Sequence, residues 1–202
     1  MTNKRALFLG AHADDVEIGC GGFLQRFENK LIYAFTPAIE SIPEGYAKDA
    51  TIKEFNESSK KIGCECRLDN LAVRHFPKYR QYILEKLIEL KKEFKPDIVF
   101  THCSTDTHQD HSVIYNETIR AFKECSILGY GFPSNNYMIK YNYFVELTDT
   151  EFANKLEYVK CYETQVKTRG IIEIVNITSK YWGVILKKNH VEPFELIRWF
   201  QS

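Results

Sequence analysis

The sequence predicts an α/β fold, a three-layer Rossmann-like arrangement in which helices cover both faces of a mostly parallel sheet. Short apolar segments alternate with longer segments of helical periodicity, which is the pattern of repeated β-α units. The chain has 202 residues, of which 44% are hydrophobic, and this is enough for a sizeable core. No repeat or Pro/Gly/Ser-rich linker divides it, so residues 1–202 are expected to form one domain.

The predicted strands are apolar runs that end at charged or turn-forming residues. The first strand looks buried and leads directly into a segment rich in histidine and aspartate. In chain order the strands are Ala6–Gly10, Leu31–Thr36, Cys66–Val73, Asp97–His102 and Tyr141–Leu147, followed by a short extended piece at His190–Ile197.

The predicted helices have apolar residues at helical spacing and recognisable ends. Gly63 is placed as a C-cap, Pro96 stops the helix before it, and Thr148 caps the helix after it. In chain order the helices run from Val16 to about Asn29, Ala47–Ile62, Tyr79–Phe94, Ser112–Cys125, from Asp149 to about Gln165, and around Ile177–Lys187. Residues Pro37–Gly45 are predicted as a loop.

Charge and composition exclude several classes of partner. Lys+Arg and Asp+Glu both number 27, so the formal net charge is zero and no nucleic-acid partner is expected. No segment reaches the ~18–20 apolar residues of a membrane span. The start, Met1–Arg5, leads into too short an apolar run for a signal peptide. The six cysteines are therefore expected to be free thiols of a cytoplasmic protein.

Two clusters of histidine and aspartate follow two predicted strands, at His12–Asp15 and at Asp106–His111. In open α/β sheets ligands bind beyond the carboxyl ends of the strands, so both clusters are expected to meet there. Either cluster alone could be a helix cap or a solvated loop. Gly10 and Gly19–Gly22 suggest a nucleotide-binding turn, but their spacing is not G-x-G-x-x-G and two aspartates would repel a pyrophosphate. A shared metal site is the favoured interpretation.

The same segments resemble the PIG-L/LmbE-like zinc-dependent N-deacetylases. Residues 11–22, AHADDVEIGCGG, resemble the family motif A-H-P-D-D-x-E-x-G-x-G-G. Residues 96–99, PDIV, and 106–111, DTHQDH, resemble P-D-x-V followed by D-x-H-x-D-H. Weaker similarities lie at Glu54 with Ile62-Gly63, at Lys160, Tyr162 and Gln165, at Trp182-Gly183, and at Val191–Phe194.

The resemblance implies His12, Asp15 and His111 as three zinc ligands, which leaves a position for water. It implies Asp14 as the general base. The catalytic residues would also include His108, which in cationic form would stabilise the oxyanion or protonate the leaving amine, and Asp110, which would orient an imidazole. Zinc lowers the pKa of bound water to roughly 7, so this set is complete for amide hydrolysis. Fe(II), Mn and Co stay open as alternatives to zinc.

Arg74 and Asp106 are candidate substrate-binding residues, and Arg74 could hold a sugar hydroxyl or a phosphate or be a solvated loop charge. Residues 130–137 are turn-rich and aromatic, so they could form a lid or an ordinary loop. The sequence departs from the family pattern at Ala13 and Gln109, where the family has proline, which bears on loop rigidity more than on the metal ligands. It also departs at Trp182, His190 and residues 37–40, which are expected to shape the substrate pocket, so the acyl acceptor stays open.

The expected function is removal of an N-acetyl group from an N-acetylglucosamine-type sugar or amino-sugar conjugate, by water on the zinc activated by Asp14. A metal-dependent esterase or phosphoesterase on the same site is one alternative, and two metal ions would indicate it. A non-catalytic sugar-binding module is another. The expected partner is a small N-acetylated sugar, with homo-oligomer formation left open.

Overall fold

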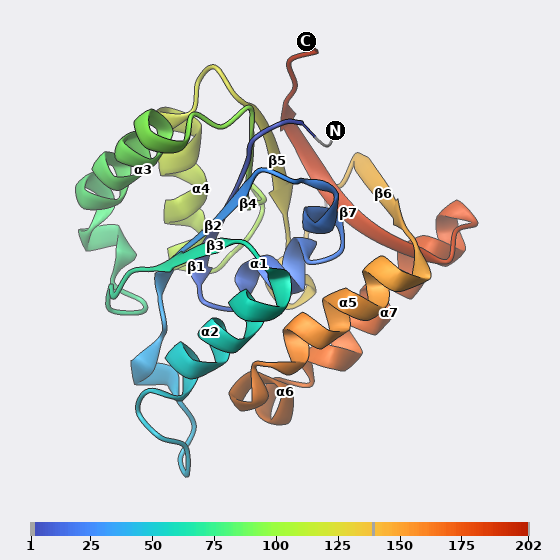
Figure 1. Cartoon of the computed structure of the whole chain (residues 1–202), viewed down its shortest axis with the longest axis horizontal. Coiled ribbons are helices and arrows are strands. Elements are labelled where there is room, and N and C mark those ends of the chain that lie inside the picture. The colour runs from blue at the N-terminus through green and yellow to red at the C-terminus, as the bar shows by residue number, and fades with distance from the viewer. Residues whose placement is uncertain (1–2, 139, 202) are drawn as a thin grey trace.

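The computed structural model describes residues 3–138 and 140–201, in which seven strands form one sheet of order β3-β2-β1-β4-β5-β7-β6 (Figure 1). Strands β3, β2, β1, β4 and β5 run parallel to one another, and β7 runs antiparallel to both of its neighbours, β5 and β6. The strands are β1 (Ala6–His12), β2 (Lys30–Thr36), β3 (Glu65–Leu68), β4 (Ile98–His102), β5 (Ser126–Tyr130), β6 (Tyr143–Leu147) and β7 (His190–Arg198).

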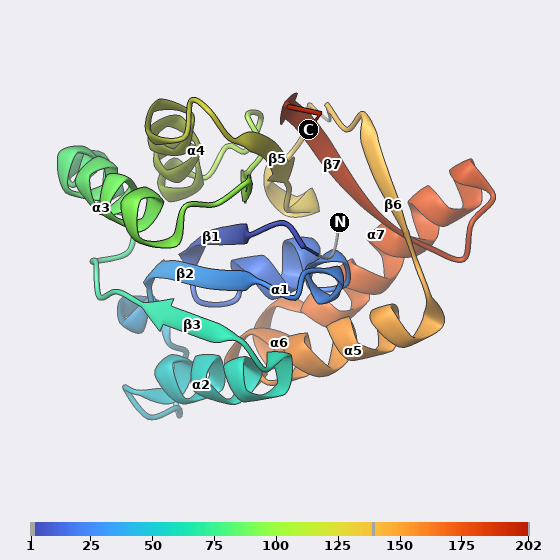
Figure 2. The same cartoon turned by 45° about the horizontal axis from the view of Figure 1, so that its top comes forward.

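Helices cover both faces of this sheet, which confirms the predicted three-layer α/β fold. Figure 2 shows α3 and α4 above the sheet and α1, α2, α5 and α6 below it. The helices are α1 (Asp15–Cys20), α2 (Ala50–Ile62), α3 (Arg80–Phe94), α4 (Gln109–Ala121), α5 (Asp149–Lys160), α6 (Glu163–Arg169) and α7 (Ile171–Leu186). Single 3-10 turns lie at Phe23–Arg26, Ile39–Ser41, Phe76–Lys78 and Pro133–Asn135. Among the residues described, no helix combines the length and apolar character that crossing a membrane would need.

The central strand β1 shows why both faces need helices. Leu7 and Leu9 pack into the core shared with α3 and α4, while Ala6 and Phe8 pack into the core shared with α1, α5 and α7. All four side chains are buried, because successive residues of a strand point to opposite faces. The sheet is therefore buried on both sides, as a parallel sheet requires.

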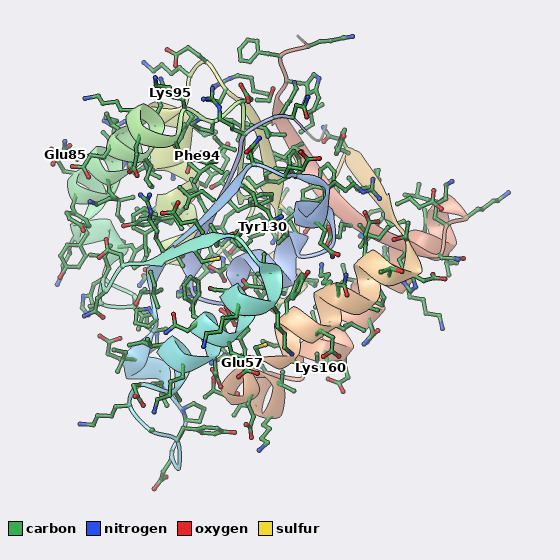
Figure 3. The ribbon with its side chains drawn as sticks, in the orientation of Figure 1. Glu57, Glu85, Phe94, Lys95, Tyr130 and Lys160 are labelled. Atoms are coloured by element: carbon green, nitrogen blue, oxygen red, sulfur yellow. The ribbon has the colours of Figure 1, made fainter. Side chains whose placement is uncertain are left out.

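The helix predicted from Val16 to Asn29 is wrong in length, since α1 ends at Cys20. The helix does not continue because the backbone N–H groups of Gly22 and Phe23 donate to the carboxylate of Glu192 and not to carbonyl oxygens of α1. A Cβ at Gly19 would come within 2.1 Å of the ring of Tyr130, whose hydroxyl donates to the Leu9 carbonyl oxygen. Figure 3 shows Tyr130 in the interior of the molecule. Gly19 therefore packs directly against a side chain of β5, and a separate 3-10 turn follows α1 at Phe23–Arg26.

Other predicted boundaries are also corrected. The predicted strand Cys66–Val73 ends at Leu68, and the predicted helix from Asp149 to Gln165 is two helices, α5 and α6. The break occurs because the buried carboxylate of Glu54 accepts hydrogen bonds from the backbone and hydroxyl of Thr164, which start α6 anew. Strand β5 was not predicted, α7 begins six residues before the predicted Ile177, and the short tail piece is the nine-residue strand β7.

Strand β7 also ties the C-terminal part of the chain to the first motif. The carboxylate of Glu192 accepts hydrogen bonds from the backbone N–H groups of Gly22 and Phe23 at 2.8 and 2.7 Å. The ammonium group of Lys155 lies 2.6 Å from the same carboxylate, and both side chains are buried. A buried charge that is paired and hydrogen-bonded in this way fixes the turn that follows α1.

The topology also locates the site. Strands β1 and β4 are parallel neighbours at the centre of the sheet, and the chain leaves them toward opposite faces, into α1 and α4. A crevice forms beyond the carboxyl ends of two such strands, because their connections diverge. Both predicted clusters lie at this crevice.

Candidate metal and catalytic site

Three side chains bring metal-binding atoms together at the crevice. His12 Nδ1 lies 3.0 Å from His111 Nε2 and 3.3 Å from Asp15 Oδ2, and His111 Nε2 lies 3.5 Å from Asp15 Oδ1. Zinc bonds of ~2.0–2.1 Å in a tetrahedron place ligand atoms about 3.3 Å apart. The spacing and the His/carboxylate chemistry therefore fit one divalent metal ion with an open position.

Local structure fixes these ligands. His12 ends β1, and its backbone N–H donates to Asp15 Oδ2 at 2.7 Å, so the first turn of α1 is folded back onto the strand. His111 lies in the first turn of α4, where its side chain is directed to the strand ends. Asp15 and His111 are buried, and His12 is partly exposed.

A carboxylate contacts the second ring nitrogen of each histidine. Asp106 Oδ2 lies 2.8 Å from His111 Nδ1, and Asp110 Oδ2 lies 3.4 Å from His12 Nε2. Burial alone would raise the pKa of Asp106, but its hydrogen bond with His111 holds that pKa below the usual range. The carboxylates thus fix the proton on one nitrogen and leave the lone pair of the other nitrogen facing the metal position.

Asp106 does not lie where a substrate contact was expected. Its side chain is fully buried behind His111, also accepts from the His108 backbone N–H at 2.9 Å, and forms no part of the cavity wall. A buried carboxylate under a ligand supports that ligand rather than a sugar, so the substrate-binding expectation for Asp106 is revised.

Asp14 lies on the cavity wall beside the ligands. Although it is the residue before α1, its side chain forms no cap with that helix, which removes the simple capping explanation. Burial and the neighbouring charge of Asp15 raise the pKa of Asp14 to about 6. A carboxylate with such a pKa can accept a proton near neutrality.

His108 lies on the same wall as the N-cap residue of α4. Its Nδ1 accepts a hydrogen bond from the Asp110 backbone N–H at 3.2 Å, so the proton of the ring is on Nε2. Burial and the nearby His12 lower the pKa of His108. In this arrangement the His108 ring accepts at Nδ1 and can donate from Nε2, and its catalytic role stays a prediction.

His102 is a site residue that sequence reasoning placed only as the end of a strand. Its ring is buried and stacks on His111, with centroids 3.8 Å apart and planes within 9°. Its Nε2 accepts from the Ala11 backbone N–H at 3.1 Å and lies 3.3 Å from Asp15 Oδ2. With that lone pair in use, His102 supports the ligands from behind. Its position at the carboxyl end of β4 was the available signal.

The ligands open into a cavity of 440 Å³, within the usual range for a small-molecule site. Arg74 lies on its wall, in a left-handed backbone conformation with φ of 66°. The Arg74 backbone N–H donates to Asp110 Oδ2 at 2.6 Å, and its carbonyl oxygen accepts from Gln109. Of the segment 130–137, Phe132, Ser134 and Asn135 reach the wall, so a lid role stays a prediction.

Comparison with known proteins decides the family. Residues 7–122 match the PIG-L family, described as GlcNAc-PI de-N-acetylase. The chain belongs to the PIG-L family. A relative of this chain, the uncharacterized deacetylase YaiS of Escherichia coli K12, is 31% identical over 176 residues, covering 80% of this chain and 93% of that protein.

Solved structures show the same fold. The N,N'-diacetylchitobiose deacetylase of Pyrococcus horikoshii superposes with a TM-score of 0.76 at 20% identity, over 95% of this PIG-L chain and 82% of the other. GalB, the 4-carboxy-2-hydroxymuconate hydratase of Pseudomonas putida KT2440, superposes with a TM-score of 0.77 at 14% identity, over 98% of each chain. Because this fold also carries a hydratase, the reaction has to be argued from the site.

Proposed function

We propose that this PIG-L chain is a single-domain, metal-dependent N-deacetylase that removes acetyl from an N-acetylglucosamine-type sugar or amino-sugar conjugate. The observation that carries the proposal is the cluster of His12, Asp15 and His111 donor atoms, 3.0 to 3.5 Å apart, with Asp14 on the adjoining cavity wall. The family membership and the acetylated sugar named for the Pyrococcus horikoshii deacetylase favour the same substrate class.

We propose His12, Asp15 and His111 as the metal ligands and Asp106 and Asp110 as the residues that orient the two histidines. Zinc suits this donor set, and Fe(II), Mn and Co share its ligand preferences. When bound, the metal ion supplies a Lewis acid that acidifies water and polarises the amide carbonyl group.

The chain's own groups then handle the protons and the developing charge. Asp14 accepts a proton from the attacking water, since its carboxylate is ionised above a pKa of about 6. His108 donates from Nε2 to the amide oxygen, where negative charge develops in the tetrahedral transition state. The protonated Asp14 can then pass its proton to the leaving amine, which completes hydrolysis without a further residue.

The alternatives fit the site less well. A phosphoesterase would more often hold two metal ions about 3.5–4 Å apart. Among the described residues the two candidate ligand groups, His12-His108-His111 and Asp15-His102-His111, share His111 and so do not form two independent sites. A sugar-binding module would have no need of Asp14, an uncapped carboxylate with a raised pKa beside the ligands.

The proposal is tested by acetate release from a panel of N-acetylated sugars, with metal content measured on the same preparations. We expect about one transition-metal ion per wild-type chain, loss of metal in His111→Ala, and metal retention with kcat lowered about 10²–10⁴-fold in Asp14→Asn. Deacetylation that persists at the wild-type rate in Asp14→Asn, or wild-type protein purified without chelator that binds no metal, would contradict it.

A further inference from the structure

We infer that Cys64 and Cys66 form a redox-active thiol pair, which hydroperoxides convert into a reversible disulfide. The two residues lie where α2 ends and β3 begins, in the segment Cys64-Glu65-Cys66. Neither residue belongs to the wall of the metal cavity. The inference concerns a modification site apart from the proposed metal centre, and it does not depend on the proposed deacetylase function.

The two thiols are already in contact. The Sγ atoms of Cys64 and Cys66 lie 3.7 Å apart, and Cys66 Sγ also lies 3.6 Å from the Cys64 carbonyl oxygen. A disulfide has an S–S distance of about 2.05 Å, so the sulfur atoms need to approach by less than 2 Å. The reduced pair is therefore close to the geometry of its oxidised form.

The backbone allows this approach. Two residues apart in a strand, side chains point to the same face and Cα atoms are separated by about 6.6 Å, within the ~4.4–6.8 Å that disulfides span. Cys64 precedes the first ladder pair of β3, Leu31 with Glu65, and β3 is the end strand of the sheet. Figure 2 shows β3 at this edge, beside α2. Cys64 can thus move toward Cys66 without breaking a pair of the sheet.

Access distinguishes this pair from the rest of the thiols. Cys64 and Cys66 are partly exposed, whereas the other four cysteines are buried. Among the described residues, the groups that could hold a metal ion include neither Cys64 nor Cys66, so the pair lacks the further ligands of a zinc clip. Oxidation is the chemistry that two adjacent, accessible thiols support on their own.

The surroundings give the two thiols different roles. A hydrogen bond from the Cys66 thiol and the positive charge of Lys30 lower the pKa of Cys64, against the effect of burial. Donating that hydrogen bond, together with burial, raises the pKa of Cys66. The thiolate is the nucleophile in thiol chemistry, so Cys64 attacks the oxidant and Cys66 resolves the product.

The reaction balances with one hydroperoxide, ROOH. The Cys64 thiolate attacks the O–O bond, which breaks to give a sulfenic acid on Cys64 and, with a proton from water, the alcohol ROH. The Cys66 sulfur then displaces the hydroxyl group from the sulfenic acid. The S–S bond forms, the S–O bond breaks, and the Cys66 proton leaves with the hydroxyl group as water. A disulfide in so short a loop is strained, and strained disulfides are readily reduced by small thiols through exchange.

The experiment treats the zinc-loaded protein with hydrogen peroxide, because zinc has no redox chemistry of its own. Remaining thiols are alkylated under denaturing conditions, and the chain is cleaved with trypsin after Lys61 and Arg67. Both cysteines then lie in one peptide, residues 62–67, IGCECR. We expect this peptide to become lighter by two hydrogen atoms and to resist alkylation, and dithiothreitol to restore both alkylation sites. The peptides that carry the buried cysteines are expected to stay reduced.

Variants separate the roles of the two thiols. In Cys66→Ser the sulfenic acid of Cys64 has no partner, so the peptide should become heavier by one or more oxygen atoms. In Cys64→Ser the remaining thiol has the raised pKa, and its oxidation should be about tenfold slower than that of Cys64 in Cys66→Ser. Cys161→Ser is the matched control, because buried Cys161 packs in the same cluster as Cys66. It should leave the disulfide unchanged.

The wild-type peptide map decides the inference without any variant. An internal disulfide in residues 62–67 that dithiothreitol reverses would support it. A peptide that stays fully alkylatable while buried cysteines oxidise, or that gains oxygen without forming a disulfide, would overturn it. Loss of the disulfide in Cys161→Ser would assign the bridge to Cys66 and Cys161 and would also overturn it. Acetate release enters none of these readouts, so failure of the deacetylase proposal leaves them unaffected.

Discussion

His102 and His111 stack with ring centroids 3.8 Å apart and planes within 9° of parallel. This contact joins the end of β4 to the first turn of α4, and so connects the sheet to a proposed metal ligand. Asp15 lies against both rings, with oxygens 3.3 Å from His102 Nε2 and 3.5 Å from His111 Nε2. The ligand positions therefore depend on a third histidine.

Replacing His102 should weaken metal binding although it contributes no free lone pair. In His102→Phe the stacking surface stays, but the Ala11 N–H loses its acceptor and Asp15 loses a neighbour. Residues that support ligands typically contribute 10–100-fold to metal affinity. Chelator competition should show a loss of that size, while His75→Phe, an exposed site, should leave affinity unchanged. An unchanged metal affinity in His102→Phe would show that His102 does not support the metal ligands.

Asp106→Asn distinguishes ligand support from substrate contact. Loss of the carboxylate under His111 should lower metal affinity about 10–100-fold. Activity at saturating metal should then largely recover, with an unchanged KM for the sugar. A raised KM with normal metal affinity would restore the substrate-binding interpretation for Asp106.

Asp14→Asn should lower kcat by about 10²–10⁴-fold without loss of metal, the usual range for a general base. In the wild type, activity needs the ionised carboxylate, so kcat/KM should fall as pH drops through about 6 or somewhat below. In the metal-loaded protein the acidic limb of the pH–rate profile lies at lower pH, because a bound cation stabilises the ionised carboxylate of Asp14. A pH–rate profile of wild type beside Asp14→Asn checks this, and an identical acidic limb in the variant would exclude Asp14 as its source.

Glu17 should make stability fall as pH rises. Burial raises the pKa of Glu17 to about 7, against 4.5 for a free glutamate, although Ser58 and Tyr162 donate to Oε1 at 2.6 and 2.7 Å. A folded-state pKa above the unfolded value favours the folded state at low pH. Its contribution is fully present below about 4.5 and is lost as pH passes 7.

Denaturant unfolding at pH 5.5 and 8.5 measures this effect. Of the difference between the two pKa values, the part between pH 5.5 and about 7 lies within this comparison, and it corresponds to roughly 2 kcal/mol at about 1.4 kcal/mol per pH unit. Glu17→Gln copies the protonated form, so the pH dependence should flatten by that amount relative to wild type. Parallel curves for the two proteins would show that Glu17 does not titrate in this range.

The layers and the two clusters could be predicted because each depends on neighbours in the chain. The apolar alternation of β1 fixes a doubly buried strand, and the segment after it carries His12 and Asp15 in sequence. The strand ends of a parallel sheet then bring His111 to the same crevice. These inferences need only periodicity and topology.

The missed features depend on contacts between distant segments. The break between α5 and α6 arises from Glu54, which is 110 residues from Thr164, and the early end of α1 arises from Glu192, which is 170 residues from Gly22. The ring proton of His108 is on Nε2 because the backbone N–H of Asp110, at the start of α4, donates to Nδ1. Arg169 reaches the cavity because α6 ends at the cavity wall. Residue types alone give no sign of these relationships.

The anchoring of Gly22 and Phe23 by Glu192 has a consequence for how the molecule is made. The turn that follows His12 and Asp15 gains its partner only after residue 192 has been added, 170 residues after Gly22. Strand β6 is joined to the rest of the sheet through β7, so its place in the sheet also depends on the segment around residue 192. In the nascent chain the turn after this motif thus stays unsecured until translation has passed the segment that forms β7.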